Sequence, residues 1–132
     1  MIFIVEDDVI YQELVKNELV ESQYSNIEVF SNGMDCVSNL YKMPDIIMVD
    51  YNLDKKMNGI QVLKSAKSFD KDIQVIIFSA QEKLDVIINS IKYGAYDYVV
   101  KNEFAMRRLR RMVNSICKWN GCTMICQQLK II

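Results

Sequence analysis

Short apolar segments alternate along the chain with longer segments in which apolar and polar residues recur at helical spacing. The apolar segments predict five β-strands, near residues 1–5, 27–30, 45–49, 73–78 and 97–100. The amphipathic segments predict five helices, near residues 8–22, 33–42, 59–69, 82–93 and 103–118. This alternation, without internal repeats, is typical of βαβ units, in which helices connect parallel strands.

Polar and glycine residues mark the ends of several predicted helices. Asp7 or Asp8 can cap the first helix, because a carboxylate there accepts hydrogen bonds from free backbone N–H groups. On the same helix, Ile10 and Leu14 are expected to belong to the buried stripe. Gly94 lies just beyond the fourth helix, where a left-handed C-terminal cap favours glycine.

The third and fourth predicted strands are apolar on both faces, whereas the second is short and mixed. Strands apolar on both faces are covered by helices on both sides, and a mixed strand suits a sheet edge. The expected fold class is α/β, a three-layer doubly wound sandwich with five helices on a five-stranded parallel sheet of flavodoxin-like order 2-1-3-4-5. Residues 1–118 are expected to form one domain, and residues 119–132 a C-terminal tail of unassigned structure.

Composition excludes several classes of function. With 16 basic and 17 acidic side chains the net charge is −1, which gives no indication of direct nucleic-acid binding. The sequence holds no histidine, which excludes Ser-His-Asp and Cys-His catalysis and a phosphohistidine carrier within it. Its four cysteines lack the spacing of a zinc site. No signal peptide or membrane span is recognisable, so a cytoplasmic location without membrane association is expected.

Polar side chains stand where four predicted strands end. Glu6 and Asp7 follow the first strand, and Asp50, Ser79 and Lys101 follow the third, fourth and fifth. Because the carboxyl ends of parallel strands open into one crevice, these side chains should lie together. Each alone has an ordinary structural explanation as a cap, a turn residue or a surface lysine. However, Asp50 ends an almost wholly apolar strand, where an unpaired carboxylate would cost several kcal/mol.

This set of side chains suits a divalent cation and a phosphoryl group. If the first and third strands are neighbours, Asp7 and Asp50 face each other and need a cation between them. A hard ion such as Mg²⁺ takes oxygen ligands, to which the backbone carbonyl of Asn52 could add. The free oxygen of Asp50 is then a candidate nucleophile toward phosphorus, while Ser79 and Lys101 can neutralise charge on the phosphoryl oxygens.

The chain resembles the receiver domains of bacterial two-component response regulators over residues 1 to about 117. The resemblance rests on the strand and acidic motif at residues 2–8, on Asp50 at the phosphoacceptor position, on Ser79 followed by a small residue, and on Lys101. The intervals between these residues fit the family pattern. The resemblance implies a signalling protein in a two-component system or phosphorelay, not an enzyme.

For the site, the resemblance implies that Asp50 accepts a phosphoryl group from a sensor histidine kinase or a phosphotransfer protein. It implies that Mg²⁺ or Mn²⁺ is held by Asp7, Asp50 and the Asn52 carbonyl, with Glu6 acting through a water molecule. Tyr98 matches the aromatic switch position, which changes orientation when the hydroxyl residue moves toward the phosphoryl group. From the residues alone, a half-buried strand tyrosine is the preferred interpretation of Tyr98.

The surface expected to change on phosphorylation comprises the fourth helix, fifth strand and fifth helix. Asp97 and Arg111 lie on it and form a candidate ion pair across the two-fold axis of a homodimer. An alternative is a solvated basic helix face. A downstream protein is the other partner expected, because no output domain is recognisable after the fifth helix. Either the chain acts by binding a partner, or it is a fragment of a larger regulator.

Two other functions remain open from the sequence. One is a pseudo-receiver, an interaction module that has lost phosphorylation. The other is a phosphatase with an aspartyl nucleophile, but such enzymes carry a second Asp two residues after the nucleophile. Here that position is Asn52, which cannot donate a proton as a general acid. Asn102 is a further departure, because many receivers have proline after the lysine.

Overall fold

The sheet of this protein holds five parallel strands in the order β2-β1-β3-β4-β5, as a computed structural model of residues 1–53 and 56–120 shows. The strands are β1 (Ile2–Val5), β2 (Ile27–Phe30), β3 (Ile46–Asp50), β4 (Gln74–Ser79) and β5 (Asp97–Val100). The helices are α1 (Val9–Glu21), α2 (Gly33–Ser38), the 3₁₀ helix η1 (Leu40–Lys42), α3 (Gly59–Phe69), α4 (Leu84–Lys92) and α5 (Ala105–Asn120).

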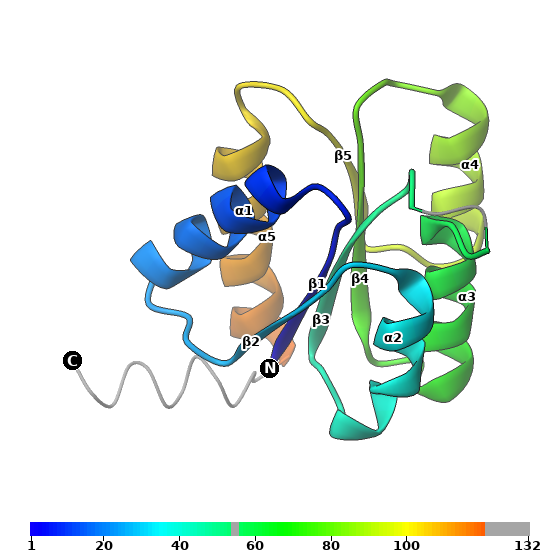
Figure 1. Cartoon of the computed structure of the whole chain (residues 1–132), viewed down its shortest axis with the longest axis horizontal. Helices are drawn as coiled ribbons and strands as arrows, with labels where there is room; N and C mark the ends of the chain where they lie inside the picture. The colour runs from blue at the N-terminus through cyan, green and yellow to red at the C-terminus, as the bar shows by residue number, and fades with distance from the viewer. Residues whose placement is uncertain (54–55, 121–132) are drawn as a thin grey trace.

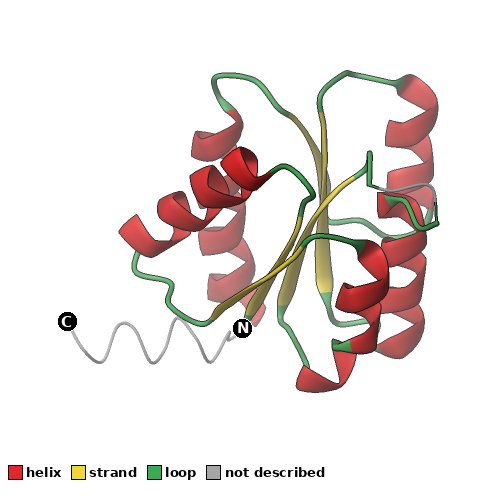
Figure 2. Ribbon diagram, viewed as in Figure 1, coloured by secondary structure: helices red, strands yellow, loops and turns green. Residues whose placement is uncertain are grey.

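Helices cover both faces of the sheet. Helices α1 and α5 pack on one face and α2, α3 and α4 on the other (Figure 1), so that helix, sheet and helix form three layers (Figure 2). Alternate residues of β1 follow this division: Ile2 and Ile4 belong to the core beneath α1 and α5, and Phe3 and Val5 to the core beneath the other helices. The expected α/β sandwich and its strand order are confirmed.

Helix α1 turns a different stripe toward the core from the one expected. Ile10 and Leu14 are 81% and 48% exposed, whereas Val15 and Leu19 are buried and Tyr11 packs against the same core. Both stripes have helical spacing, so periodicity alone does not choose between them. The tertiary packing of Val15, Leu19 and Tyr11 against the core sets the rotation. The Asp8 carboxylate accepts a hydrogen bond from the backbone N–H of Ile10, which fixes only where the helix begins.

Several element boundaries differ from the expected ones. The second expected helix ends at Ser38, and η1 continues it as a separate 3₁₀ turn. By contrast, the expected left-handed cap after the fourth helix is present, because Gly94 has a φ of +92°. Helix α5 runs to Asn120, and the rest of the expected tail, residues 121–132, lies outside the described residues. None of the described helices combines the length and apolarity needed to cross a lipid bilayer.

Candidate functional site

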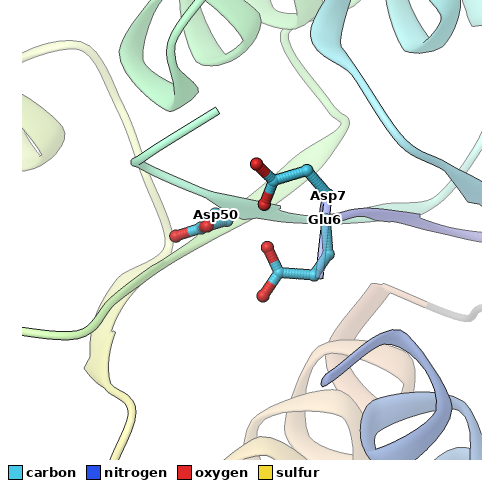
Figure 3. Close-up of side chains that lie close together, drawn as sticks. All are labelled: Glu6, Asp7 and Asp50. Carbon is cyan, nitrogen blue, oxygen red and sulfur yellow. The ribbon is translucent and has the colours of Figure 1, made fainter. Parts of the chain in front are cut away.

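Three carboxylates converge at the carboxyl edge of the sheet. The neighbouring strands β1 and β3 are in register, with Val5 opposite Val49, so the residues that follow meet at the same level. One oxygen each from Glu6, Asp7 and Asp50 lies within 4.8 Å of the others, and the three side chains surround a common space (Figure 3). Glu6 and Asp50 are only 3% and 6% exposed, whereas Asp7 is exposed.

Backbone hydrogen bonds between strands hold the polar residues at this edge. Asp50 and Ser79 are the last residues of β3 and β4, one position later than the expected strand ends. The N–H of Tyr51 donates to the carbonyl of Phe78 at 2.7 Å, and the N–H of Lys101 donates to the carbonyl of Ser79 at 2.8 Å. The ladder therefore extends past the apolar strands and fixes the backbone beneath each functional side chain.

Gly59 lets helix α3 begin against the site. A Cβ at this position would lie 2.8 Å from both the carbonyl oxygen of Asp50 and the Cα of Tyr51, which are backbone atoms that cannot move aside. The N–H of Gly59 also donates to the carbonyl of Tyr51 at 3.1 Å. From the sequence, Asn58-Gly59 indicates only a turn; the close approach to Asp50 depends on tertiary packing.

Lys101 reaches two of the three carboxylates. Its ammonium is 3.4 Å from Asp50 Oδ2 and makes a closer ion pair with Glu6 Oε1. The same nitrogen lies 4.3 Å from the centroid of the Tyr11 ring. Three carboxylates thus share one ammonium among the described residues, and the site has an excess of negative charge unless a proton or another cation is present.

Burial, followed by the hydrogen bond with Asp50, raises the pKa of Glu6 to about 8, against the lowering effect of Lys101. Burial, followed by the negative charges of Glu6 and Asp50, raises the pKa of Tyr11 to about 12. The Tyr11 hydroxyl therefore stays neutral, and the site favours an added positive charge. No signal in the sequence identifies Tyr11 as a neighbour of Lys101, because the contact depends on how α1 is rotated.

The donor set fits a hard divalent cation. All three converging side chains offer carboxylate oxygens, and Glu6 Oε2 is buried with no hydrogen-bond partner among the described residues. Mg²⁺ and Mn²⁺ prefer such oxygen ligands. Asn52 lies beside them, since its N–H donates to Asp50 Oδ1 at 3.3 Å.

Ser79 and Tyr98 share a hydrogen-bond acceptor. The buried Ser79 hydroxyl donates to the backbone carbonyl of Gln81 at 3.0 Å, and the Tyr98 hydroxyl donates to the same carbonyl at 2.6 Å. Tyr98 is 8% exposed, so its ring is turned into the protein. The hydroxyl residue and the expected switch residue are thereby connected through one atom of the β4–α4 loop.

Outside the crevice, Asp97 pairs within the chain. Its Oδ2 lies 3.1 Å from Arg108 Nη2, one turn before the expected partner Arg111, which is exposed. The pairing of Asp97 with Arg111 of a second copy stays a prediction. After Lys101, the chain continues through a trans peptide bond, and the Asn102 carboxamide oxygen accepts a hydrogen bond from Phe104 N–H at 2.9 Å, which caps the turn into α5.

Comparison with known proteins agrees with this geometry. The family model for the response regulator receiver domain matches residues 2–114. A protein-glutamate methylesterase/protein-glutamine glutaminase of Clostridium acetobutylicum is 35% identical over 108 residues, 77% of this chain but only 30% of that relative, so this chain spans less than a third of it. Chemotaxis protein CheY of Thermotoga maritima is 28% identical over 118 residues, 89% of this chain and 97% of that protein.

Solved structures of receiver domains are also similar to this chain. The signal receiver domain of a putative Luxo repressor protein from Vibrio parahaemolyticus is 26% identical with a TM-score of 0.81, covering 95% of each chain. A chain of the CheX-CheY-BeF3-Mg+2 complex from Borrelia burgdorferi is also 26% identical, with a TM-score of 0.76 and coverage of 86% of this chain and 87% of that one. With the crevice and its strand order, these similarities show that the chain belongs to the family of response regulator receiver domains.

Proposed function

We propose that this chain is a phosphorylation-activated switch in which Asp50 accepts a phosphoryl group from a sensor histidine kinase or a phosphotransfer protein. The observation that carries the proposal is the position of Asp50: a carboxylate that is 6% exposed, 3.4 Å from the Lys101 ammonium and within reach of two more carboxylates. Receiver domains are signalling domains that act with histidine kinases and downstream effectors, which supports this assignment.

In the proposed reaction an oxygen of Asp50 attacks the phosphorus atom of a donor phosphohistidine. The new P–O bond forms as the P–N bond to the donor imidazole breaks, and the imidazole, which carries a proton on its other ring nitrogen, leaves as the neutral base. Bound Mg²⁺ or Mn²⁺ would neutralise charge on the phosphoryl oxygens. Asp7, Asp50 and the Asn52 carbonyl would hold the ion directly, and Glu6 through a water molecule.

Two side chains of the chain would then bind the phosphoryl group. Lys101 would exchange its contact with Glu6 for a phosphoryl oxygen, and the Ser79 hydroxyl would leave the Gln81 carbonyl to donate to another. Because these bonds exist only after phosphorylation, they shift the population between two conformations. Tyr98 shares the Gln81 carbonyl and lies on β5, so it would pass the change to the α4-β5-α5 face.

Intact mass spectrometry tests the phosphorylation. With Mg²⁺ and phosphoramidate or acetyl phosphate, the mass should rise by one phosphoryl group, and Asp50→Asn should abolish the rise. The matched control is Asp45→Asn, at the residue just before β3 and far from the crevice, which should be phosphorylated like the unmodified protein. If the unmodified protein gains no mass with either donor, the proposal is wrong and a non-phosphorylated pseudo-receiver is favoured. Sustained turnover of a generic phosphomonoester would instead favour a phosphatase.

The output is proposed to be binding of a downstream protein or of a second copy through the α4-β5-α5 face. Leu84, Ile88 and Ile91 are 73%, 54% and 69% exposed, which leaves apolar surface on the α4 part of this proposed face. Light scattering with and without beryllofluoride distinguishes the two partners. A doubled mass with beryllofluoride supports a homodimer through this face, and an unchanged mass contradicts it.

A further inference from the structure

The Lys101 ammonium is bounded on one side by an aromatic ring. Its nitrogen lies 4.3 Å from the centroid of the Tyr11 ring, in addition to its contacts with Glu6 and Asp50. A cation at this distance is attracted to the electron-rich ring face. Carboxylates and an aromatic ring thus bound the cation, and the ring has no place in the chemistry assigned so far.

The ring is held in place independently of Lys101. Tyr11 lies in the first turn of α1, whose start is fixed by the Asp8 cap. Its ring also packs against Phe78 of β4, with the centroids 6.2 Å apart and the planes at 68°, a favourable edge-to-face geometry. A ring fixed by the helix cap and by core packing can therefore position the flexible lysine, rather than the reverse.

We propose that Tyr11 is a positioning residue for Lys101, whose ring face keeps the ammonium at the phosphoryl-binding side of the crevice. The consequence for the reaction rests on the proposed function, while the contact itself does not. On phosphorylation Lys101 exchanges Glu6 for the phosphoryl oxygen, and the ring is the neighbour that can stay in contact throughout. A neutral ring does this without adding charge, whereas another carboxylate would compete for the ammonium and raise the negative charge further.

The ring, and not the hydroxyl, carries this role. The Tyr11 hydroxyl oxygen is buried and has no hydrogen-bond partner among the described residues. It therefore donates to neither Glu6 nor Asp50, although both help line the small cavity beside the ring. Phenylalanine keeps the ring face and removes only the hydroxyl, so Tyr11→Phe and Tyr11→Leu separate the two parts of the side chain.

The contact is tested first by NMR of the unphosphorylated protein. A proton over a ring face is shifted upfield, so the Lys101 Hε resonances should lie upfield of those of exposed lysines. The shift should persist in Tyr11→Phe and disappear in Tyr11→Leu. Lys101 Hε resonances at ordinary lysine positions in the unmodified protein would overturn the proposal without any reference to phosphorylation.

The consequence is tested by the rate of phosphorylation with phosphoramidate and saturating Mg²⁺. Tyr11→Leu should lower the rate between about 2-fold and about 30-fold, the range that a cation–π energy corresponds to. Tyr11→Phe should restore it. Trifluorophenylalanine at position 11 keeps the shape but weakens the ring face, and should give an intermediate rate even if Tyr11→Leu fails to fold. The matched control is Tyr93→Leu. The Lys64 ammonium lies 4.1 Å from the centroid of the Tyr93 ring, and this pair is remote from the site, so the phosphorylation rate of this variant should not change.

A double-mutant cycle separates positioning from a general structural role. In a Lys101→Gln background, Tyr11→Leu should have no further effect on the residual rate, because the group that the ring positions is gone. An equal effect in both backgrounds, or equal rates for leucine and phenylalanine at position 11, would overturn the proposal. If the unmodified protein is phosphorylated and only the Tyr11 variants behave unexpectedly, the proposed function stands.

Discussion

Ion pairs lie at both ends of the central strands, but only at the amino end do positive and negative charges occur in equal numbers. At the amino end, the Met1 ammonium lies 2.8 Å from Asp45 Oδ2, and these side chains are 24% and 37% exposed. At the carboxyl end, the single ammonium of Lys101 faces Glu6 and Asp50, whose side chains are 4% and 7% exposed, with Asp7 close by. A balanced, exposed pair contributes little to stability. The unbalanced, buried group favours binding of a cation, and this difference distinguishes the functional end from the structural one.

The largest expected effect comes from removing the cation of the buried group. Lys101→Gln should lower the rate of phosphorylation at least about 100-fold, because a positioned charge at the phosphoryl oxygens is lost. The rate is measured by intact mass with phosphoramidate and Mg²⁺. Mg²⁺ affinity, measured by calorimetry, should not fall, because removing a positive charge leaves the carboxylates free for the metal. A rate within threefold (about 0.7 kcal/mol) of the unmodified protein would contradict this role.

The next largest effect concerns the packing of helix α3 against the carboxyl end of β3. Gly59→Ala should lower the free energy of unfolding by about 1 to 3 kcal/mol, because the new Cβ meets the backbone of Asp50 and Tyr51 at 2.8 Å. Urea denaturation measures the change. Ser68→Ala is the control, an exposed position of the same helix, and should stay within about 0.5 kcal/mol. Equal stability of the two variants would show that α3 can move away from the site without cost.

A smaller effect follows from the charge imbalance itself. The pKa of Glu6 is raised to about 8 from an ordinary 4.5, so between these values the folded chain holds a proton that the unfolded chain has lost. Stability therefore falls as pH rises through this window, and levels off above it. In EDTA, the melting temperature should be lower at pH 8.5 than at pH 6 by several degrees. Glu6→Gln should remove most of this drop, and a melting temperature that rises over the window would contradict the sign.

The smallest effect is expected at the amino end. Asp45→Asn breaks the exposed pair with the Met1 ammonium and should cost less than about 1 kcal/mol in the free energy of unfolding. Thermal denaturation at low and high salt measures it, and the difference from the unmodified protein should shrink with salt, since exposed charges are screened. A loss comparable to that of Gly59→Ala would remove the distinction between the two ends.

The sequence predicts the fold and the content of the site because both follow short-range rules. Apolar segments identify the strands, and parallel strands bring their carboxyl ends together, which places Glu6, Asp50 and Lys101 in one crevice without further information. Asp8 as a cap is likewise a local feature and is confirmed.

The remaining features depend on distances between segments that are far apart in the sequence. The rotation of α1 brings Tyr11, and not Ile10, toward the core, although both residues have suitable helical neighbours. The approach of Gly59 to the Asp50 backbone and the pairing of Asp97 with Arg108 depend on side-chain and helix packing in the same way. Periodicity gives the spacing of residues along one element, but not the contact that one element makes with another.

The Gln81 carbonyl, which accepts hydrogen bonds from both Ser79 and Tyr98, has a consequence for genetic dissection of the protein. Every amino acid supplies a backbone carbonyl, so no substitution at position 81 deletes the acceptor. Alanine substitutions at Ser79 and Tyr98 would remove the two donors, whereas alanine at position 81 would leave their shared acceptor in place. Replacing the amide that contains this carbonyl with an ester, which weakens its oxygen as an acceptor, would expose it. Selection can thus let the side chain at position 81 vary while the connection that its backbone makes is preserved.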